Sequence, residues 1–233
     1  MAADMHGRGA QKGMQAVLFD NDGTIADTKA MIVESFQYAT QTVLHKSFPE
    51  ETFMAKSGIP LADMMADYTD DPTLQQELLD VYRTYNHKIH DERIALFAGE
   101  VEALEALTAR GFRLGVVTSK LHALAQHGLD VLGISRFMDV LVGADDCEKA
   151  KPDSAPILIA CAALGVEPAR TVYVGDSPFD IQAGNAAGCH TIAVSWGHHP
   201  VFKLQAQHPD VLIDGFSQLA GAVEALTCEN AAL

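Results

Sequence analysis

Six short apolar segments, separated along the chain by stretches with helical patterning, constrain the possible folds more than any other feature. They are Gln15–Asp20, Arg113–Ser119, Asp139–Gly143, Thr171–Gly175, His190–Val194 and Asp210–Ile213. Each is rich in Val, Ile and Leu without strict alternation of polar and apolar residues, which is typical of strands buried on both faces. Strands that alternate with helices form parallel sheets. The chain is therefore predicted to be an α/β protein built around a parallel sheet.

Two of the intervening stretches indicate where helices begin and end. In Glu100–Arg110 the apolar residues recur on one helical face, and Gly111 is a suitable C-terminal stop. A second helix has its apolar face on Ile157–Leu164 and ends at Gly165. Pro152 is expected at the start of this helix, because proline is favoured in the first turn.

The stretch of residues 28–96 departs from this alternation. It contains helical patterns over Lys29–Leu44 and Thr73–His90, with a loop around Gly58 and Pro60 and a shorter helix between them, and no convincing parallel strand. An all-helical insertion between the first two strands indicates a cap domain. The predicted organisation is a flexible tail at 1–13, an α/β core at 14–27 and 97–227, and a helical cap at 28–96.

The net charge limits the partners. With 31 acidic and 16 basic residues among 233, the formal net charge is −15 at pH 7, which argues against binding of nucleic acid or an anionic membrane. No apolar run reaches the ~18 residues of a membrane span, and the four cysteines form no CxxC pair. Two histidine pairs, His87/His90 and His198/His199, are candidate metal ligands. We expect a cytoplasmic monomer or homodimer that binds neither nucleic acid nor membrane.

The strongest indication of chemistry is the pair Asp20 and Asp22, which follows the first apolar segment directly. Two carboxylates at the end of a buried strand are costly to desolvate, and they repel each other. A divalent cation removes both penalties, Gly23 allows a sharp turn, and an aspartate beside the cation can act as a nucleophile. The alternative is a solvated, aspartate-rich turn.

Polar residues also follow the other strands, namely Thr118 and Ser119, Lys151, and the pair Asp176 and Asp180. In an open parallel sheet, ligands bind beyond the carboxyl ends of the strands, where the winding direction reverses. If the first and fourth strands are neighbours at that point, the four aspartates converge. Oxygen ligands of this kind suit Mg²⁺.

Taken in order, these motifs resemble those of the haloacid dehalogenase-like superfamily, in its phosphatase branch with a helical cap. The motif DxDGT is matched from Asp20 to Thr24, the strand-end threonine by Thr118, the lysine before a helix by Lys151, and GDxxxD by residues 175–180. We accordingly predict a Rossmann-like three-layer parallel sheet whose strands, numbered along the chain, lie in the order 6-5-4-1-2-3.

The resemblance implies a catalytic role for residues at these positions. Asp20 would attack phosphorus, and Asp22 would protonate the leaving oxygen and later deprotonate water. Thr118, Ser119 and Lys151 would bind the phosphoryl oxygens of the substrate, with Lys151 balancing charge in the transition state.

The resemblance also implies a Mg²⁺ site. Asp20 and Asp176 would bind the ion directly, and Asp22 would bind it through its backbone carbonyl. Asp180 would act through water or by orienting Lys151.

The residues alone are also compatible with simpler structural roles. Thr118 would suit the N-cap of a following helix, and Asp180 the first turn of another. Lys149 competes with Lys151, although only Lys151 precedes a proline. Asn21 stands where leucine is common in the superfamily, and it is expected to point away from the two aspartates.

Two cap segments bear on the substrate. Lys56–Leu61 resembles a segment of phosphoglycolate phosphatases, and Tyr82–Asp91 resembles a YRxxNHxxHD segment of the superfamily's bacterial inorganic pyrophosphatases. Lys56, Arg83 and His90 are therefore predicted to bind a second phosphate or a small carboxylate. Pyrophosphate and phosphoglycolate both fit this prediction.

The segment Tyr82–Asp91 could instead have a structural role, and the protein could have a different function. Tyr82, Tyr85 and Ile89 would also form a core stripe whose polar neighbours face solvent. A sugar-phosphate phosphomutase of the β-phosphoglucomutase type is an alternative enzyme, although Leu61 stands where an arginine would be expected. A non-catalytic binding protein of this fold is a third possibility, which the presence of both motif aspartates disfavours.

Overall fold

The computed structural model describes residues 14–229, so the tail predicted at 1–13 lies outside the described residues. Six parallel strands form one sheet in the order β3-β2-β1-β4-β5-β6, as predicted. They are β1 (Ala16–Phe19), β2 (Arg113–Val117), β3 (Val140–Val142), β4 (Thr171–Gly175), β5 (His190–Val194) and β6 (Val211–Ile213). Because β1 pairs with both β2 and β4, the ends of these three strands lie together at one edge of the sheet.

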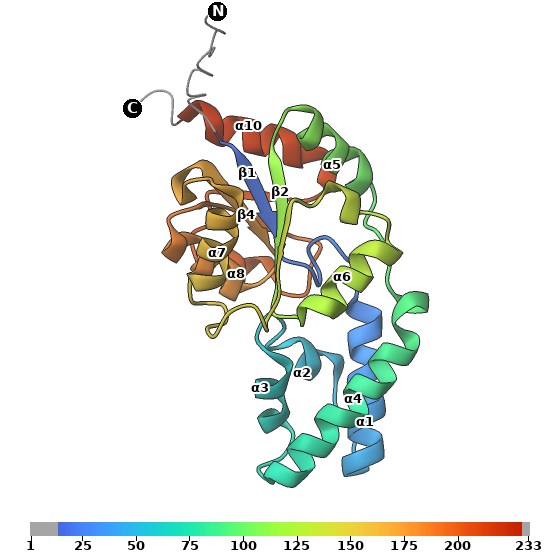
Figure 1. The fold of residues 1–233 in the computed structure, drawn as a ribbon. Coiled ribbons are helices and arrows are strands. Elements are labelled where there is room, and N and C mark those ends of the chain that lie inside the picture. Colours follow the sequence, from blue (N-terminus) through green and yellow to red (C-terminus); the bar gives the residue numbers. More distant parts are fainter. Residues whose placement is uncertain (1–13, 230–233) are drawn as a thin grey trace, which may run out of the picture.

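Helices cover both faces of the sheet. They are α5 (Glu100–Ala109), α6 (His122–Val131), α7 (Ala155–Leu164), α8 (Pro178–Ala187), α9 (Val201–Gln205) and α10 (Leu219–Glu229), with 3₁₀ helices η2 (Ser135–Phe137), η3 (Pro168–Arg170) and η4 (Phe216–Gln218). Val17 and Phe19 of β1 pack in an apolar cluster with α5, α6 and α10, whereas Ala16 and Leu18 pack with α7 and α8. Figure 1 shows α5 and α10 on one side of the sheet and α7 and α8 on the other. The predicted three-layer α/β fold is confirmed.

For α7 (Ala155–Leu164), the predicted C-terminal end is correct and the predicted N-terminal end is wrong. Gly165 follows the helix in the left-handed conformation, with φ 65°, as expected of a C-terminal glycine. Pro152, however, is not at its start. The helix begins at Ala155, whose backbone N–H donates to Asp153 Oδ1 at 2.9 Å, and Pro156 is the proline in its first turn.

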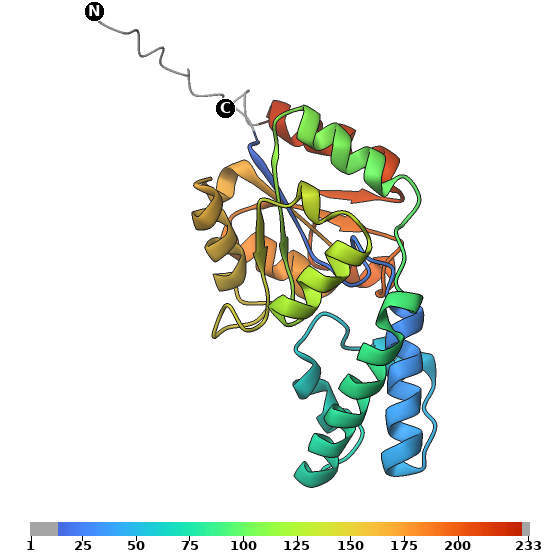
Figure 2. The same cartoon turned by 45° about the vertical axis from the view of Figure 1, so that its right-hand side comes forward.

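Between β1 and β2 the chain forms a separate helical body, seen below the sheet in Figures 1 and 2. Its elements are α1 (Lys29–Leu44), α2 (Glu50–Met54), α3 (Leu61–Met64), η1 (Met65–Asp67) and α4 (Pro72–Arg93). The α4 helix is longer than predicted. It begins earlier because Asp71 accepts a hydrogen bond from the backbone N–H of Thr73 at 2.8 Å, and so caps it.

The helical body has an apolar core of its own. The ring of Phe36 stacks on that of Phe53, with centroids 5.3 Å apart, and it also contacts the rings of Tyr68 and Tyr82. We call this body the cap; its boundaries at 28–96 stay a prediction. None of the helices within residues 14–229 is long and apolar enough to cross a membrane. The carboxyl ends of the central strands point toward the cap (Figure 1), so residues after these strands lie between the two bodies.

Candidate active site

Three aspartates meet at the edge of the sheet that faces the cap. Asp20 follows β1 and Asp176 follows β4, and these strands pair directly, with Phe19 opposite Val174. Asp180 comes from the first turn of α8. All three residues are buried, and their carboxylate oxygens lie within 4.8 Å of one another. Three of the four aspartates expected to converge therefore lie together, and Asp22 is not part of this group.

Lys151 lies among these carboxylates. Its Nζ is 2.8 Å from Asp20 Oδ1 and 2.6 Å from Asp180 Oδ1. A third neighbour is the hydroxyl of Tyr173, 3.2 Å from Nζ, which donates a hydrogen bond to the carbonyl of Val117. The Lys151 side chain is 1 % exposed. Burial opposes its charge, but the two carboxylates outweigh burial and raise the pKa of Lys151, so the ammonium form persists.

The structure distinguishes Lys149 from Lys151 and shows what Asp180 contacts. Lys149 pairs with Asp153 at the surface, at 3.0 Å, and does not enter the site. Asp180 combines both proposed roles. One carboxylate oxygen accepts hydrogen bonds from the backbone N–H and the hydroxyl of Ser177 in a capping box, and the other binds Lys151.

The single ammonium group of Lys151 is not enough to neutralise the three buried carboxylates of Asp20, Asp176 and Asp180. Burial and the neighbouring carboxylates raise the pKa of Asp20 to about 8, against the opposing effect of Lys151. Burial also raises the pKa of Asp176. With all three carboxylates ionised beside one ammonium, the site would carry two net negative charges, and a divalent cation would neutralise them and favour the ionised forms. An all-oxygen donor set suits Mg²⁺, so Asp20, Asp176 and Asp180 fit the ion that the sequence predicts.

Asp22 contacts a different lysine. Lys120 Nζ lies 2.8 Å from its Oδ1. Burial opposes ionisation of Asp22, but Lys120 outweighs burial and lowers the pKa of this carboxyl group. The prediction that Asn21 points away is wrong, since its side-chain amide donates to Asp22 Oδ1 at 3.2 Å. The reason is the tight turn after β1, in which the Asn21 carbonyl accepts the backbone N–H groups of residues 24–26.

Thr118 and Ser119 follow β2 and line the cavity between the cap and the strand ends. Thr118 is not a helix N-cap, because α6 begins only at His122; its hydroxyl accepts the backbone N–H of Lys120 at 3.2 Å. The hydroxyl of Ser119 donates to the carbonyl of Gly58 in the cap at 2.7 Å. The end of β2 therefore touches both the site and the cap.

A second contact holds the cap loop to the core. His198 Nδ1 lies 2.7 Å from the Ser57 hydroxyl oxygen, and His199 Nε2 lies 2.8 Å from the Ser57 carbonyl oxygen. The backbone N–H of His198 also donates to Asp176 Oδ2 at 2.6 Å. The histidine pair suggested as metal ligands thus contacts the cap loop through one ring nitrogen of each residue.

A cavity of about 220 Å³ separates the cap from the strand ends. Its polar lining includes Asp20, Asp22, Thr118, Ser119 and Lys120 from the core, and Arg83, Asn86, His87 and His90 from α4. Lys56 does not line it, contrary to its predicted substrate contact. Its ammonium lies 2.5 Å from Asp67 Oδ1 on the cap surface, which holds it away from the cavity.

Both interpretations of the α4 segment hold in part. Tyr82 and Ile89 are buried in the structure, and the Tyr85 hydroxyl donates to Glu34 at 2.8 Å. Arg83 nevertheless lines the cavity, and its contact with substrate stays a prediction. The same holds for His90, whose Nδ1 is 2.8 Å from Asp91 Oδ1 and whose pKa is lowered by burial.

Three residues of the site escape prediction from the sequence. Lys120 stands directly after Ser119, so its position at the end of a strand could have indicated that it belongs to the site. Tyr173 lies inside an apolar strand and has the sequence signature of a core residue. His198 contacts Asp176 only because a loop far along the chain folds over the strand ends.

Comparison with known proteins agrees with the motifs. Residues 17–194 match the family model described as Haloacid dehalogenase-like hydrolase. The chain is 33% identical over 208 residues to Pyrophosphatase PpaX from Bacillus velezensis, which covers 89% of this chain and 95% of that protein. It is 34% identical over 215 residues to Pyrophosphatase PpaX from Bacillus pumilus, covering 91% and 97%.

Solved structures share the fold. One, titled a predicted phosphoglycolate phosphatase from Haemophilus somnus, has a TM-score of 0.85 at 24% identity and covers 92% of this chain and 99% of that chain. A β-phosphoglucomutase from Clostridium difficile has a TM-score of 0.81 at 18% identity, covering 94% and 100%. At these identities the likeness concerns architecture, and the substrate has to be inferred from the site.

Proposed function

The chain belongs to the haloacid dehalogenase-like hydrolases, and on that basis we propose that it is a Mg²⁺-dependent phosphatase whose preferred substrate is inorganic pyrophosphate. One observation carries the choice of substrate. The cavity that holds Asp20 is also lined by basic side chains outside the aspartate cluster, namely Lys120, Arg83 and His87. Relatives of similar length that are named pyrophosphatase support the same choice.

Asp20 is the proposed nucleophile. One of its carboxylate oxygens attacks phosphorus and forms an O–P bond while the P–O bond to the leaving group breaks. Lys151, 2.8 Å from Asp20 Oδ1, stabilises negative charge on the non-reacting phosphoryl oxygens. The hydroxyl of Thr118, at the end of the neighbouring strand, donates a hydrogen bond to another of these oxygens. The products of this half-reaction are an aspartyl-phosphate and the free leaving group.

Asp22 is the proposed general acid and base, and its contact with Lys120 bears on that role. While Lys120 lies at 2.8 Å, Asp22 stays ionised and cannot donate a proton. An anionic second phosphate that draws Lys120 to itself would release Asp22 to take up a proton. The proton then goes to the leaving phosphate, and Asp22 later removes one from the water that hydrolyses the aspartyl-phosphate. A neutral leaving group would not draw Lys120 away.

Mg²⁺ is the proposed cofactor. When bound, it would supply positive charge that reduces the repulsion between the nucleophile and the phosphoryl group. Asp20 and Asp176 would hold it directly, with the backbone carbonyl of Asp22 as a further ligand. Asp180 would act through water, because its two carboxylate oxygens accept hydrogen bonds from Lys151 and Ser177. What supports this is the set of carboxylate oxygens within 4.8 Å of one another and their uncompensated charge.

2-Phosphoglycolate is the second candidate substrate. Its carboxylate could take the place of the second phosphate beside Lys120 and Arg83, since both cations bind either anion. A sugar phosphate has no second anion for these cations, and the apolar Leu61 faces the cavity where a mutase would be expected to carry an arginine.

The test is phosphate release with Mg²⁺ from pyrophosphate, 2-phosphoglycolate and a hexose phosphate, for the wild type, Arg83→Ala and Lys88→Ala. Lys88 is the matched control, because it is an exposed cation on the same helix that does not line the cavity. We expect pyrophosphate to have the highest kcat/KM. Arg83→Ala should lower that value about 10- to 100-fold, as for loss of a charged hydrogen bond, and Lys88→Ala should leave it unchanged.

Two results would contradict the proposal separately. If the hexose phosphate has the highest kcat/KM, or is isomerised without release of phosphate, the substrate class is wrong. If Arg83→Ala keeps the wild-type kcat/KM for pyrophosphate, the role given to Arg83 is wrong.

A further inference from the structure

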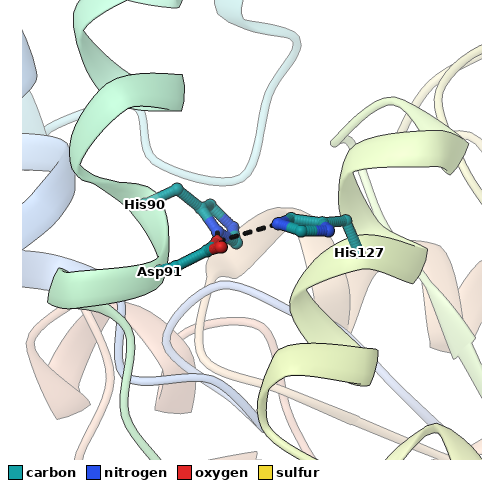
Figure 3. Close-up of side chains that lie close together, drawn as sticks. All are labelled: His90, Asp91 and His127. Carbon is teal, nitrogen blue, oxygen red and sulfur yellow. Dashed lines mark hydrogen bonds and ion pairs between the residues drawn. The ribbon is translucent and has the colours of Figure 1, made fainter.

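Two histidines and an aspartate meet where the cap touches the core, outside the aspartate cluster. His90 and Asp91 lie in the last turn of α4, and His127 lies on α6 of the core. Asp91 Oδ1 is 2.8 Å from His90 Nδ1 and 2.8 Å from His127 Nε2. Figure 3 shows the carboxylate of Asp91 between the two rings. All three ligand atoms lie within 4.8 Å of one another.

We propose that His90, Asp91 and His127 form a binding site for a divalent transition-metal ion of the Zn²⁺ type. The donor set is two imidazole nitrogens and one carboxylate oxygen. Imidazole suits Zn²⁺ and its neighbours in the first transition series, whereas Mg²⁺ prefers oxygen ligands. Three protein ligands and one open position are also the usual set for an accessible zinc ion. This site therefore differs in chemistry from the all-oxygen cluster of Asp20, Asp176 and Asp180.

The ligand atoms have to be rearranged for an ion to enter. Ligand atoms on a tetrahedral zinc ion lie about 3.3 Å apart, as follows from bonds of about 2.0–2.1 Å. The two hydrogen-bonded pairs therefore have to separate by about half an ångström. The two histidine nitrogens, which lie within 4.8 Å of each other, also have to come to about 3.3 Å. The side chains of His127 and Asp91 are 47% and 55% exposed, so both can move toward solvent without displacing core residues. His90 is buried and supplies the fixed ligand.

The proton balance also permits binding. In the hydrogen-bonded arrangement an imidazole that carries one N–H donates it to Asp91 Oδ1, from Nδ1 of His90 and from Nε2 of His127. For metal binding the proton of each ring moves to its other nitrogen, Nε2 of His90 and Nδ1 of His127. The ion then replaces two hydrogen bonds by three metal–ligand bonds, with no net loss of protons. Since α4 belongs to the cap and α6 to the core, the ion would join the two bodies beside the cavity that His90 lines.

The experiment is calorimetric titration of the full chain with Zn²⁺ in saturating Mg²⁺, which occupies the oxygen cluster. His127→Gln removes one ligand from an exposed position. His122→Gln is the matched control, because His122 lies on the same helix, is 42% exposed and pairs with a single carboxylate, that of Asp146. We expect His127→Gln to bind one Zn²⁺ equivalent fewer than the wild type, and His122→Gln to bind as many as the wild type. Equal stoichiometry and affinity in the wild type and His127→Gln would overturn the proposal.

Co²⁺ gives a second readout that does not depend on turnover. Tetrahedral Co²⁺ bound by nitrogen and oxygen absorbs visible light far more strongly than octahedral Co²⁺ in an oxygen site. The wild type should show this absorption in the presence of Mg²⁺, and both His127→Gln and Asp91→Ala should lose it while keeping the wild-type circular dichroism. If either variant keeps the absorption, or if the wild type lacks it, these residues do not form the site.

Discussion

Glu100 is a carboxyl group buried in the first turn of α5, and it should make the stability of the protein depend on pH. The residue is 0% exposed, and its Oε2 accepts the backbone N–H of Phe97 at 2.9 Å. Its Oε1 has no hydrogen-bond partner among the described residues. Burial raises the pKa of Glu100 from 4.5 to about 8. We therefore expect the folded protein to hold this group protonated at neutral pH, whereas the unfolded chain ionises it.

The sign and size of the effect follow from proton linkage. Between pH 4.5 and about 8 the folded state binds one proton more at this position than the unfolded state. The free energy of unfolding should therefore fall by about 1.4 kcal/mol per pH unit in this window. The stabilising contribution is complete below the unfolded pKa and lost as the pH rises through the folded pKa. At pH 7 the loss amounts to about 3 kcal/mol.

A Glu100→Gln variant lacks the ionisable group, yet its amide oxygen can still accept the Phe97 N–H. Urea unfolding of both proteins can be followed by the fluorescence of Trp196, the one tryptophan of the chain, whose ring centroid lies 6.0 Å from that of Phe97. Other titrating groups cancel in the comparison. The difference in unfolding free energy should shift in favour of the variant by about 1.4 kcal/mol for each unit of rising pH.

The control is Glu102→Gln, which removes an exposed carboxylate from the same helix and should show no such pH dependence. A difference between the wild type and Glu100→Gln that stays constant between about pH 5.5 and pH 7.5 would refute the linkage argument.

Four further outcomes are expected. EDTA should stop phosphate release and added Mg²⁺ should restore it; activity that persists in EDTA would contradict the proposed ion. Asp20→Asn should abolish turnover while the Tm does not fall, and turnover above background would show that another group is the nucleophile. Asp22→Asn should slow phosphate release by about 10²–10⁴-fold, the range of general acid–base catalysis, so a wild-type rate would exclude that role. Gly58→Ala should lower kcat/KM about tenfold through backbone strain, since φ is +104° and an added Cβ would lie 2.8 Å from Ser177 Oγ; an unchanged value would show that the cap loop need not dock there.

Much of the fold could be predicted because its signals are local. The six apolar segments contain all six strands, and the helical pattern over Lys29–Leu44 matches α1 to the residue. The order of the six strands was implied by the resemblance to the superfamily; a shared ion at Asp20 and Asp176 requires only that β1 and β4 are neighbours, as they are. The predictions of helix ends from short sequence patterns were less accurate. Pro152 was misplaced because α7 begins only at Ala155, whose backbone N–H donates to Asp153 Oδ1, and the proline of its first turn is Pro156.

In the site, the positions of residues at strand ends could be predicted from the sequence, but their contacts could not. By itself, the sequence determined which residues stand at the ends of parallel strands, and a parallel sheet brings those ends to one edge; Asp20, Thr118 and Asp176 could be placed for that reason. Only the tertiary structure decided which groups these side chains contact. Lys120 binds Asp22 across 98 residues of chain, and Lys56 is drawn to Asp67 instead of the cavity.

The cap illustrates the same difference. The sequence identified its two long helices, α1 and α4, and the segment that carries Arg83 and His90, because helical periodicity and motif spacing are properties of neighbouring residues. That His198 binds Ser57 and that His127 joins His90 and Asp91 depends on how the cap packs against the core. Such contacts between side chains distant along the chain are set by the balance of burial, charge and hydrogen bonding over the whole fold, and a sequence pattern of a few residues does not contain that balance.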